Sequence, residues 1–431
     1  LPNFTPPAIQ VPVCALAPPE PSIRHFFRDV PSAPRQVYMP QKTSNMASVS
    51  KNEAKLPLNQ KGETHPLDRI CQIVKSHVQF PTSPRVATDT IVQATVAMAC
   101  ERNSISGFCR EHTGLPSHTT CLKYLHRLTM DELLQHAAAM LREAAQGVIS
   151  PGQTYTFAID KTSDPYYGKK STEPGSYTVG GKRKASTNYF YTYLTLSIID
   201  KDRHITLLVL PCQKGTENLA LIQGCINLIT EYGLKIRCLC IDREFYAAEI
   251  FSYLQQAGIP HIVPVKASGK ELKEKLEGRK SNTFIYTLNA TSSRPVTVTI
   301  TDCLVYLKGK GGKHGLQHHA FVVYGISPSP RSIRGLYKHR FAIESTYRLR
   351  NTTKPRTSSR DPVLRYYYTL VAFLCQNQWV HVKWNYFARI QRGPKVIEGD
   401  RFTLAHFANI VRMEALPRFK IRTVLDIAIS R

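Results

Sequence analysis

The sequence predicts an α/β protein with a mixed sheet and flanking helices. The first observation is a hairpin-like pair of apolar runs at 189–210, preceded by the strand-like run YTFAID that ends at Asp160. The second is an alternation of helix and strand, with helices expected at 217–232 and 244–257 and strands at 236–241 and 259–266. Hairpin strands pair antiparallel and strands joined through helices pair in parallel, so the two patterns together indicate a mixed sheet.

Composition and charge restrict the class of partner. The chain has 431 residues with 57 Lys and Arg against 31 Asp and Glu, which gives a formal charge of +26. A polyanion explains this imbalance, with nucleic acid as the first choice and an anionic membrane as the second. No apolar run reaches the roughly 18 residues that span a bilayer, so no membrane partner is expected. The eleven cysteines form no CxxC pair, which is typical of a reduced, cytoplasmic protein.

The amino-terminal third divides into two predicted parts. Residues 1–63 hold eleven of the 28 prolines and are expected to be disordered. Residues 64–150 show helical periodicity and are expected to form an all-helical domain. Within it, 104–114 and a helix capped near Ser117 are separated by a Gly-Pro turn, which resembles a helix-turn-helix. Lys123 and Arg127 on its second helix are candidate DNA contacts; the alternative is a plain helical bundle.

The middle of the chain combines an expected catalytic core with an insertion. We expect the core to comprise 151–267 and 325–395, with a β-rich insertion at 268–324 and a helical tail at 396–431. A polar loop after Asp160 interleaves tyrosines with basic residues, including Lys169 and Lys170. This pattern favours contact with nucleic-acid backbone and bases, although a solvated loop has the same composition.

Three carboxylates suggest a metal site. Asp160 and Asp242 each end an apolar strand, and Glu344 lies in a predicted helix from Gly335 to Arg350. In that helix Tyr337, Arg340, Glu344, Tyr347 and Arg348 recur three or four residues apart and are expected to share one face. Carboxylates held on a rigid sheet suit two Mg²⁺ ions, with Mn²⁺ as a possible substitute, and such a pair supports phosphodiester cleavage. Each aspartate alone fits a turn or cap residue better than a metal ligand, whereas the helix alone fits a salt-bridged surface helix equally well.

Three segments together resemble a known family. FAIDKTSDPYYG, the run from CLCID to IVPVK and YKHRFAIESTYRLR are similar to DDE transposases of bacterial and archaeal insertion sequences, of the cut-and-paste type with a Tyr-x2-Arg-x3-Glu-x6-Lys signature. The resemblance covers about 155–390 and implies a ribonuclease-H-like core. It implies that Asp160, Asp242 and Glu344 bind the metal ions. It also implies that Tyr337 and Arg340 contact DNA phosphates, and that a basic and an aromatic residue, here Arg243 and Tyr246, follow the second aspartate.

One signature position differs in this chain. Asn351 stands where the signature has its lysine, and Arg348, Arg350 and Lys354 are the candidate replacements. The resemblance further implies double-stranded DNA partners (terminal inverted repeats and target DNA), a homodimer in the DNA complex and a prokaryotic, nucleoid-associated protein. The expected function is DNA cleavage and rejoining at the ends of its own insertion sequence. The alternatives are a transposase-derived DNA-binding protein without cleavage activity and a structure-specific nuclease of the same fold.

Overall fold

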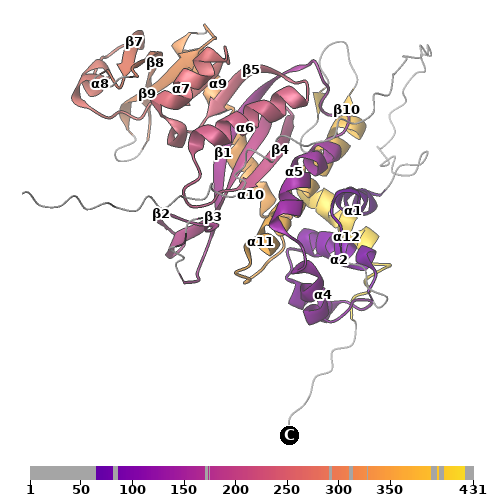
Figure 1. The fold of residues 1–431 in the computed structure, drawn as a ribbon. Helices are drawn as coiled ribbons and strands as arrows, with labels where there is room; N and C mark the ends of the chain where they lie inside the picture. The colour runs from indigo at the N-terminus through magenta and orange to yellow at the C-terminus, as the bar shows by residue number, and fades with distance from the viewer. Residues whose placement is uncertain are drawn as a thin grey trace, which may run out of the picture. The chain divides into compact units, whose positions relative to one another are not determined.

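The computed structural model describes most of the chain beyond the proline-rich segment. The described residues are 65–80, 86–169, 173, 175–290, 294–309, 314–327, 329–389, 396–397 and 402–422. They belong to one compact unit spanning residues 43–431 (Figure 1). The segment 1–63, Lys170 and the end of the tail from residue 423 lie outside the described residues.

A mixed sheet forms the centre of the described structure, which confirms the predicted fold class. Its central strands run in the order β4-β3-β1-β5-β6. Strands β1, β3 and β4 pair antiparallel, whereas β5 and β6 continue the sheet parallel to β1. These strands are β1 (Thr154–Pro165), β3 (Thr187–Asp200), β4 (Arg203–Pro211), β5 (Lys235–Ile241) and β6 (His261–Pro264). The hairpin and helix-linked patterns in the sequence thus gave the correct pairing directions.

Helices cover the two faces of this sheet. The crossovers α6 (Asn218–Glu231) and α7 (Ala248–Gln256) lie on the face toward the viewer in Figure 1, and α10 (Phe341–Arg350) and α11 (Pro362–Tyr386) lie behind it. Ala158 of β1 and Cys240 of β5 pack in one cluster with Ile343 of α10. Side chains two apart on a strand share a face, so Asp160 points to the side that α10 covers.

The segment between β6 and α9 (Pro330–Lys338) extends the same sheet. Strand β9 pairs antiparallel with β6, and β8 and β7 follow outward. The bounds are α8 (Lys270–Lys275), β7 (Asn282–Leu288), β8 (Val296–Leu307) and β9 (Gly315–Tyr324). The strands expected in the insertion are therefore present, and they are continuous with the core sheet.

The polar loop after Asp160 contains a strand that the sequence pattern did not reveal. Strand β2 (Thr178–Lys184) pairs antiparallel with β3 and connects to it through Ala185 and Ser186. Both residues have positive φ, at 50° and 63°, as a two-residue type I′ turn requires. Ala-Ser is not the Asn-Gly or Asp-Gly pair that usually marks such a turn, so the hairpin was not recognisable from sequence.

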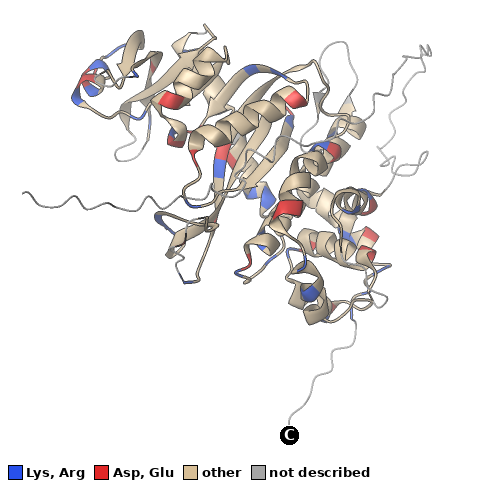
Figure 2. Ribbon diagram, in the orientation of Figure 1, with Lys and Arg blue, Asp and Glu red and all other residues tan. Residues whose placement is uncertain are grey.

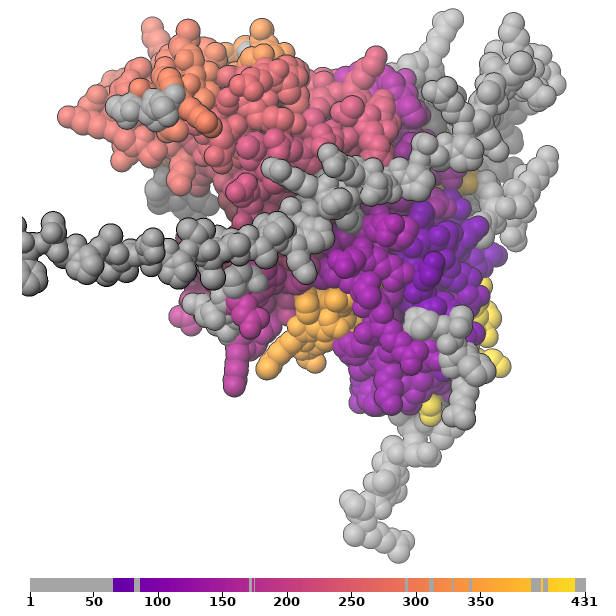
Figure 3. Space-filling model, in the orientation of Figure 1, coloured from indigo at the N-terminus to yellow at the C-terminus, as the bar shows by residue number. Residues whose placement is uncertain are grey.

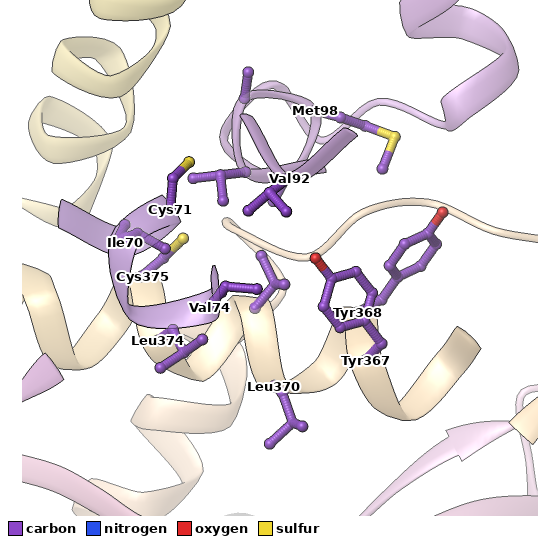
Figure 4. Packing of buried hydrophobic residues seen from close by; sticks show 14 of the residues in the cluster. Ile70, Cys71, Val74, Val92, Met98, Tyr367, Tyr368, Leu370, Leu374 and Cys375 are labelled. Atoms are coloured by element: carbon purple, nitrogen blue, oxygen red, sulfur yellow. The ribbon is translucent and has the colours of Figure 1, made fainter. Parts of the chain in front are cut away.

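A helical layer combines both ends of the described chain. Helices α1, α2 and α5 bury their apolar faces together with α11 and α12. On the surface in Figure 3, yellow C-terminal segments lie beside the indigo and purple N-terminal ones. Figure 4 shows part of this shared core, with Ile70, Cys71, Val74, Val92, Met98, Tyr367, Tyr368, Leu370, Leu374 and Cys375 labelled. The bounds are α1 (Pro66–His77), α2 (Thr88–Glu101), α3 (Ile105–Glu111), α4 (His118–Leu125), α5 (Met130–Ala144) and α12 (Leu404–Ala415).

Among the described residues, no helix is both long and apolar enough to cross a bilayer. The domain boundaries at 150, 267 and 395 remain predictions.

Candidate active site

Asp160 and Asp242 lie side by side on adjacent strands. Ile159 of β1 and Ile241 of β5 are register partners in a parallel pair, and the backbone N–H of Asp242 donates to the Ile159 carbonyl at 3.3 Å. Asp242 directly follows β5, as the sequence predicted. The strand of Asp160 was expected to end there, but β1 continues to Pro165 because its outer half pairs with β3. Asp160 is consequently buried, with 8% of its surface exposed.

Arg340 joins the two aspartates. Its Nη1 lies 3.0 Å from Asp160 Oδ2, and its Nη2 lies 3.3 Å from Asp242 Oδ1. The guanidinium carbon is 5.2 Å from the centre of the Tyr337 ring, and the Tyr337 hydroxyl donates to the Ile241 carbonyl at 3.4 Å. Four predicted site residues, two acidic, one basic and one aromatic, therefore meet at one point of the sheet.

The expected single helix from Gly335 to Arg350 is in fact two helices. Helix α9 begins at Pro330 after an N-cap hydrogen bond to Ser329, and α10 begins at Phe341. Between them the Arg340 N–H donates to the Tyr337 carbonyl, and the Ile343 N–H donates to the Arg340 carbonyl, so the chain makes tight i→i−3 turns. Because of this break, the residues that were expected on one helix face do not share it. Tyr337 and Arg340 are buried, whereas Glu344 and Arg348 are exposed.

The electrostatic environment of Asp160 is that of a carboxylate in need of a cation. Burial raises its pKa to about 7, against the lowering effect of Arg340. Like-charge repulsion from Asp242 and Glu344 raises the pKa of Asp160 further. The guanidinium of Arg340 is therefore the group that favours the charged form of Asp160.

The donor set fits a magnesium site in its chemistry. Asp160 and Asp242 present carboxylate oxygens, the ligand type Mg²⁺ prefers, and these oxygens converge on one cationic group. Glu344 lies on the first turn of α10 and is exposed. Within the described ranges, no three acidic, histidine or cysteine side chains lie close enough to share an ion. The structure thus brings two of the three predicted ligands together and leaves Glu344 on the neighbouring helix.

A second ion cluster, beside the first, was not predicted. Asp164 of β1 accepts hydrogen bonds from Arg350 Nη2 at 2.8 Å and from Lys354 Nζ, and all three side chains are largely buried. The available signal was the even spacing from Asp160 to Asp164, which puts both on one face of a strand. Two candidates for the missing signature lysine, Arg350 and Lys354, are therefore engaged by Asp164, whereas Arg348 is exposed.

The residues after Asp242 border a basic cavity. Arg243 is exposed and lines a cavity of about 680 Å³ together with Lys266, Lys273 and His318. Figure 2 shows the basic residues of α8, to which Lys273 belongs. Tyr246 packs at 5.2 Å from Phe251 and its hydroxyl is buried, so a contact between Tyr246 and DNA remains a prediction.

The other predicted DNA contacts lie on separate elements. Lys123 is exposed on α4, and Arg127 follows that helix with its guanidinium 5.3 Å from the Tyr124 ring. Lys169 is exposed and its carbonyl accepts from the Tyr166 hydroxyl, while Lys170 lies outside the described residues. The turn between α3 and α4 contains Gly114, with φ of +80°, where a Cβ would meet a backbone carbonyl at 2.8 Å. Lys123, Arg127 and Lys169 thus lie away from the aspartate pair in the chain's elements, and their roles remain predictions.

Comparisons with known proteins concern the family and the fold. Residues 151–364 match the family model described as transposase DDE domain. A solved structure of similar fold is the piggyBac transposase in a synaptic complex with hairpin DNA, with a TM-score of 0.53 and 11% identity over 81% of this chain and 76% of that chain. A comparison with curated protein sequences finds no match. Residues 151–364 are therefore similar in sequence to transposase DDE domains. The chain also shares its α/β fold, of the ribonuclease-H-like type, with the piggyBac transposase.

Proposed function

We propose that this protein is a DNA transposase that cleaves and rejoins phosphodiester bonds at the inverted-repeat ends of its own insertion sequence. The observation that carries the proposal is the convergence of Asp160 and Asp242 on one cation, at adjacent positions of the central parallel strand pair. A rigid sheet fixes the separation of the two carboxylates, which a metal-dependent nuclease needs. The family match over the same residues supports this interpretation.

Asp160, Asp242 and Glu344 are the proposed holders of two Mg²⁺ ions, with Mn²⁺ as a substitute. Two such ions neutralise charge on the attacking and leaving oxygens of a phosphodiester. The buried position of Asp160 excludes water and strengthens its attraction for cations. Glu344 completes the set from α10, whose first turn adjoins Arg340.

Arginines of the same helix pair are the proposed DNA-phosphate contacts. Arg340 and Tyr337 lie at the aspartates, and Arg348 is exposed on α10 beyond Glu344. Because Arg350 and Lys354 are bound to Asp164, Arg348 is the residue that we assign to the role of the signature lysine absent at Asn351. A guanidinium suits this role, since it binds phosphate with two parallel N–H donors.

The partners follow from the same proposal. The protein binds two kinds of double-stranded DNA, which are the terminal repeats of the element and the target DNA. Two copies of the chain bind the two ends of the element. The helix-turn-helix-like part with Lys123 and Arg127 recognises the ends, and the net charge of +26 supplies non-specific affinity. From the resemblance to insertion-sequence transposases, we propose a cytoplasmic protein of a prokaryote, associated with the nucleoid.

The proposal is tested with the full chain and duplexes taken from the DNA that flanks its reading frame. Asp160→Ala, Asp242→Ala and Glu344→Ala should each reduce cleavage in Mg²⁺ by roughly 1000-fold or more, since ligands of one site act as a unit. DNA binding should change little. The matched control is Glu249→Ala, which removes an exposed carboxylate of α7 and should leave cleavage unchanged.

Strand transfer distinguishes the proposal from its alternatives. Cut ends that join to a second plasmid indicate a transposase, and cleavage without joining indicates a nuclease. Binding without cleavage in the parent protein would indicate a DNA-binding derivative. Cleavage at close to the parent rate in any one of the three alanine variants would refute the assignment of that carboxylate.

A further inference from the structure

The guanidinium of Arg340 lies between the two aspartates that are proposed to hold metal. Its terminal nitrogens contact different carboxylates, Asp160 at 3.0 Å and Asp242 at 3.3 Å. The planar fork of a guanidinium suits two carboxylate oxygens and fixes both at once. Oxygens that would ligate a divalent ion are therefore already bound to a side chain.

Burial strengthens the electrostatic attraction between Arg340 and the aspartates. Arg340 and Asp160 each expose 8% of their surface, so water screens the charges weakly. A divalent ion bound to the same two oxygens would lie against the positively charged guanidinium. A divalent ion bound to the two aspartates therefore weakens their ion pairs with Arg340, and these ion pairs lower the affinity of the aspartates for the ion.

We infer that Arg340 acts as an internal cation that competes with divalent metal in the DNA-free protein, and that a DNA phosphate draws it away and admits the metal. The inference rests on the proposed function. A phosphate offers the guanidinium a two-oxygen acceptor of its own, which compensates for the loss of the aspartates. Linkage then requires metal and DNA to raise each other's affinity. The cleavage site would be loaded with metal only on DNA.

The position of Arg340 explains how it can move without unfolding a helix. It follows His339 in the two-residue link between α9 and α10, and it forms the N-cap position of α10. The Arg340 carbonyl accepts from the Ile343 N–H, so the proposed movement is a rotation of the side chain, which leaves the backbone hydrogen bonds of both helices intact.

Titration of the full chain with Mn²⁺, followed by electron paramagnetic resonance of the free ion, tests the inference. Arg340→Gln keeps a polar side chain, although a shorter one, and removes its charge. Loss of the two buried ion pairs predicts Mn²⁺ affinity about 10- to 100-fold higher than in the parent without DNA. A short end duplex should raise Mn²⁺ affinity in the parent and have little effect in the variant. The control is Lys338→Gln, an exposed cation at the end of α9, which should behave as the parent does.

The outcomes separate this inference from the proposed function. Arg340→Gln protein that binds Mn²⁺ no tighter than the parent would overturn the competition. If that variant fails to fold, Arg340→Lys keeps a charge but not the fork, and it should bind Mn²⁺ several-fold tighter; parent-like binding would again overturn it. The combined Asp160→Asn and Asp242→Asn variant should lose Mn²⁺ binding. Retention of binding there would contradict the metal assignment itself, on which the proposed function depends.

Discussion

The buried cluster of Asp164, Arg350 and Lys354 allows a prediction in which two of its members have opposite effects on stability. One carboxylate faces two cations, and all three groups are largely shielded from water. The pKa of Asp164 is lowered although burial alone would raise it, because Lys354 and Arg350 attract its negative charge. The pKa of Lys354 falls from 10.5 to about 8, because burial is the largest effect and Arg350 repels it. The cluster thus stabilises the charged form of Asp164 and destabilises the charged form of Lys354.

We therefore expect Asp164→Asn to destabilise the protein strongly and Lys354→Met to be neutral or stabilising. Removing the carboxylate leaves two buried cations together, which costs about 3–5 kcal/mol. Removing Lys354 leaves a balanced pair of Asp164 and Arg350. A pKa depressed from 10.5 to about 8 corresponds to at most about 3 kcal/mol against the charged form, so the gain has that upper limit. Loss of the Lys354 contact with Asp164 offsets part of the gain.

The pH dependence provides a second readout. The folded pKa of Lys354 lies below its unfolded value, so the folded chain binds fewer protons there. The resulting penalty is fully present below about pH 8 and is relieved as the pH rises from about 8 toward 10.5. The lowered pKa of Asp164 contributes stability above its ordinary value of 3.8, which is lost as the pH falls below that value. Lys354→Met should remove the rise of stability between pH 8 and 10.

Urea unfolding followed by circular dichroism at pH 7 and pH 9.5 measures these effects. The matched control is Lys275→Met, which breaks an exposed pair with Glu271 at 2.9 Å and should change stability by less than about 0.5 kcal/mol. Lys354→Met protein that is less stable than the parent by more than about 2 kcal/mol, or Asp164→Asn protein of parental stability, would refute the reasoning.

Two further predictions concern DNA binding. Lys123→Ala and Arg127→Ala should each lower the slope of log affinity against log salt by about 0.9, one phosphate contact each, and an unchanged slope in fluorescence anisotropy would argue against α4 as a DNA contact. The glycine-rich run between β8 and β9 contains Lys308, Lys310 and Lys313, of which Lys310 and Lys313 lie outside the described residues. Replacing the three lysines by serine should weaken target-DNA binding in the same assay. The melting temperature should not change, because β8 and β9 remain paired beside the run. Equal affinity for target DNA would make the loop a spacer.

The strand framework was predictable because its signals are local. Two apolar runs with the two-residue period of a strand indicated the central strands. One run contains Asp160 and the other precedes Asp242, and parallel pairing places the two strands side by side. Charge and composition indicated a polyanion without any knowledge of the fold.

The arrangement around Arg340 was not predictable from periodicity. Residues 335–350 match a helical repeat, so sequence reasoning joined two helices into one and put Arg340 beside Glu344 on a common face. The break depends on buried ion pairs with Asp160 and Asp242, which are distant in sequence. The Asp164 cluster was missed for the same reason, since its partner Arg350 is on another element. Tertiary ion pairs leave no periodic signal in a single sequence.

The two ion clusters together explain how α10 is positioned over the sheet. Arg340 at its start binds Asp160, and Arg350 at its end binds Asp164 of the same strand. Four strand residues span about 13 Å and ten helical residues about 15 Å, so the two attachments match in length and α10 lies along β1. Glu344 and Arg348 are exposed between these attachments. If a DNA phosphate releases Arg340 while Asp164 retains Arg350, the first turn of α10 gains freedom and its last turn does not. Glu344 is on that first turn, so the release that exposes the aspartates to metal also frees the third carboxylate to join them.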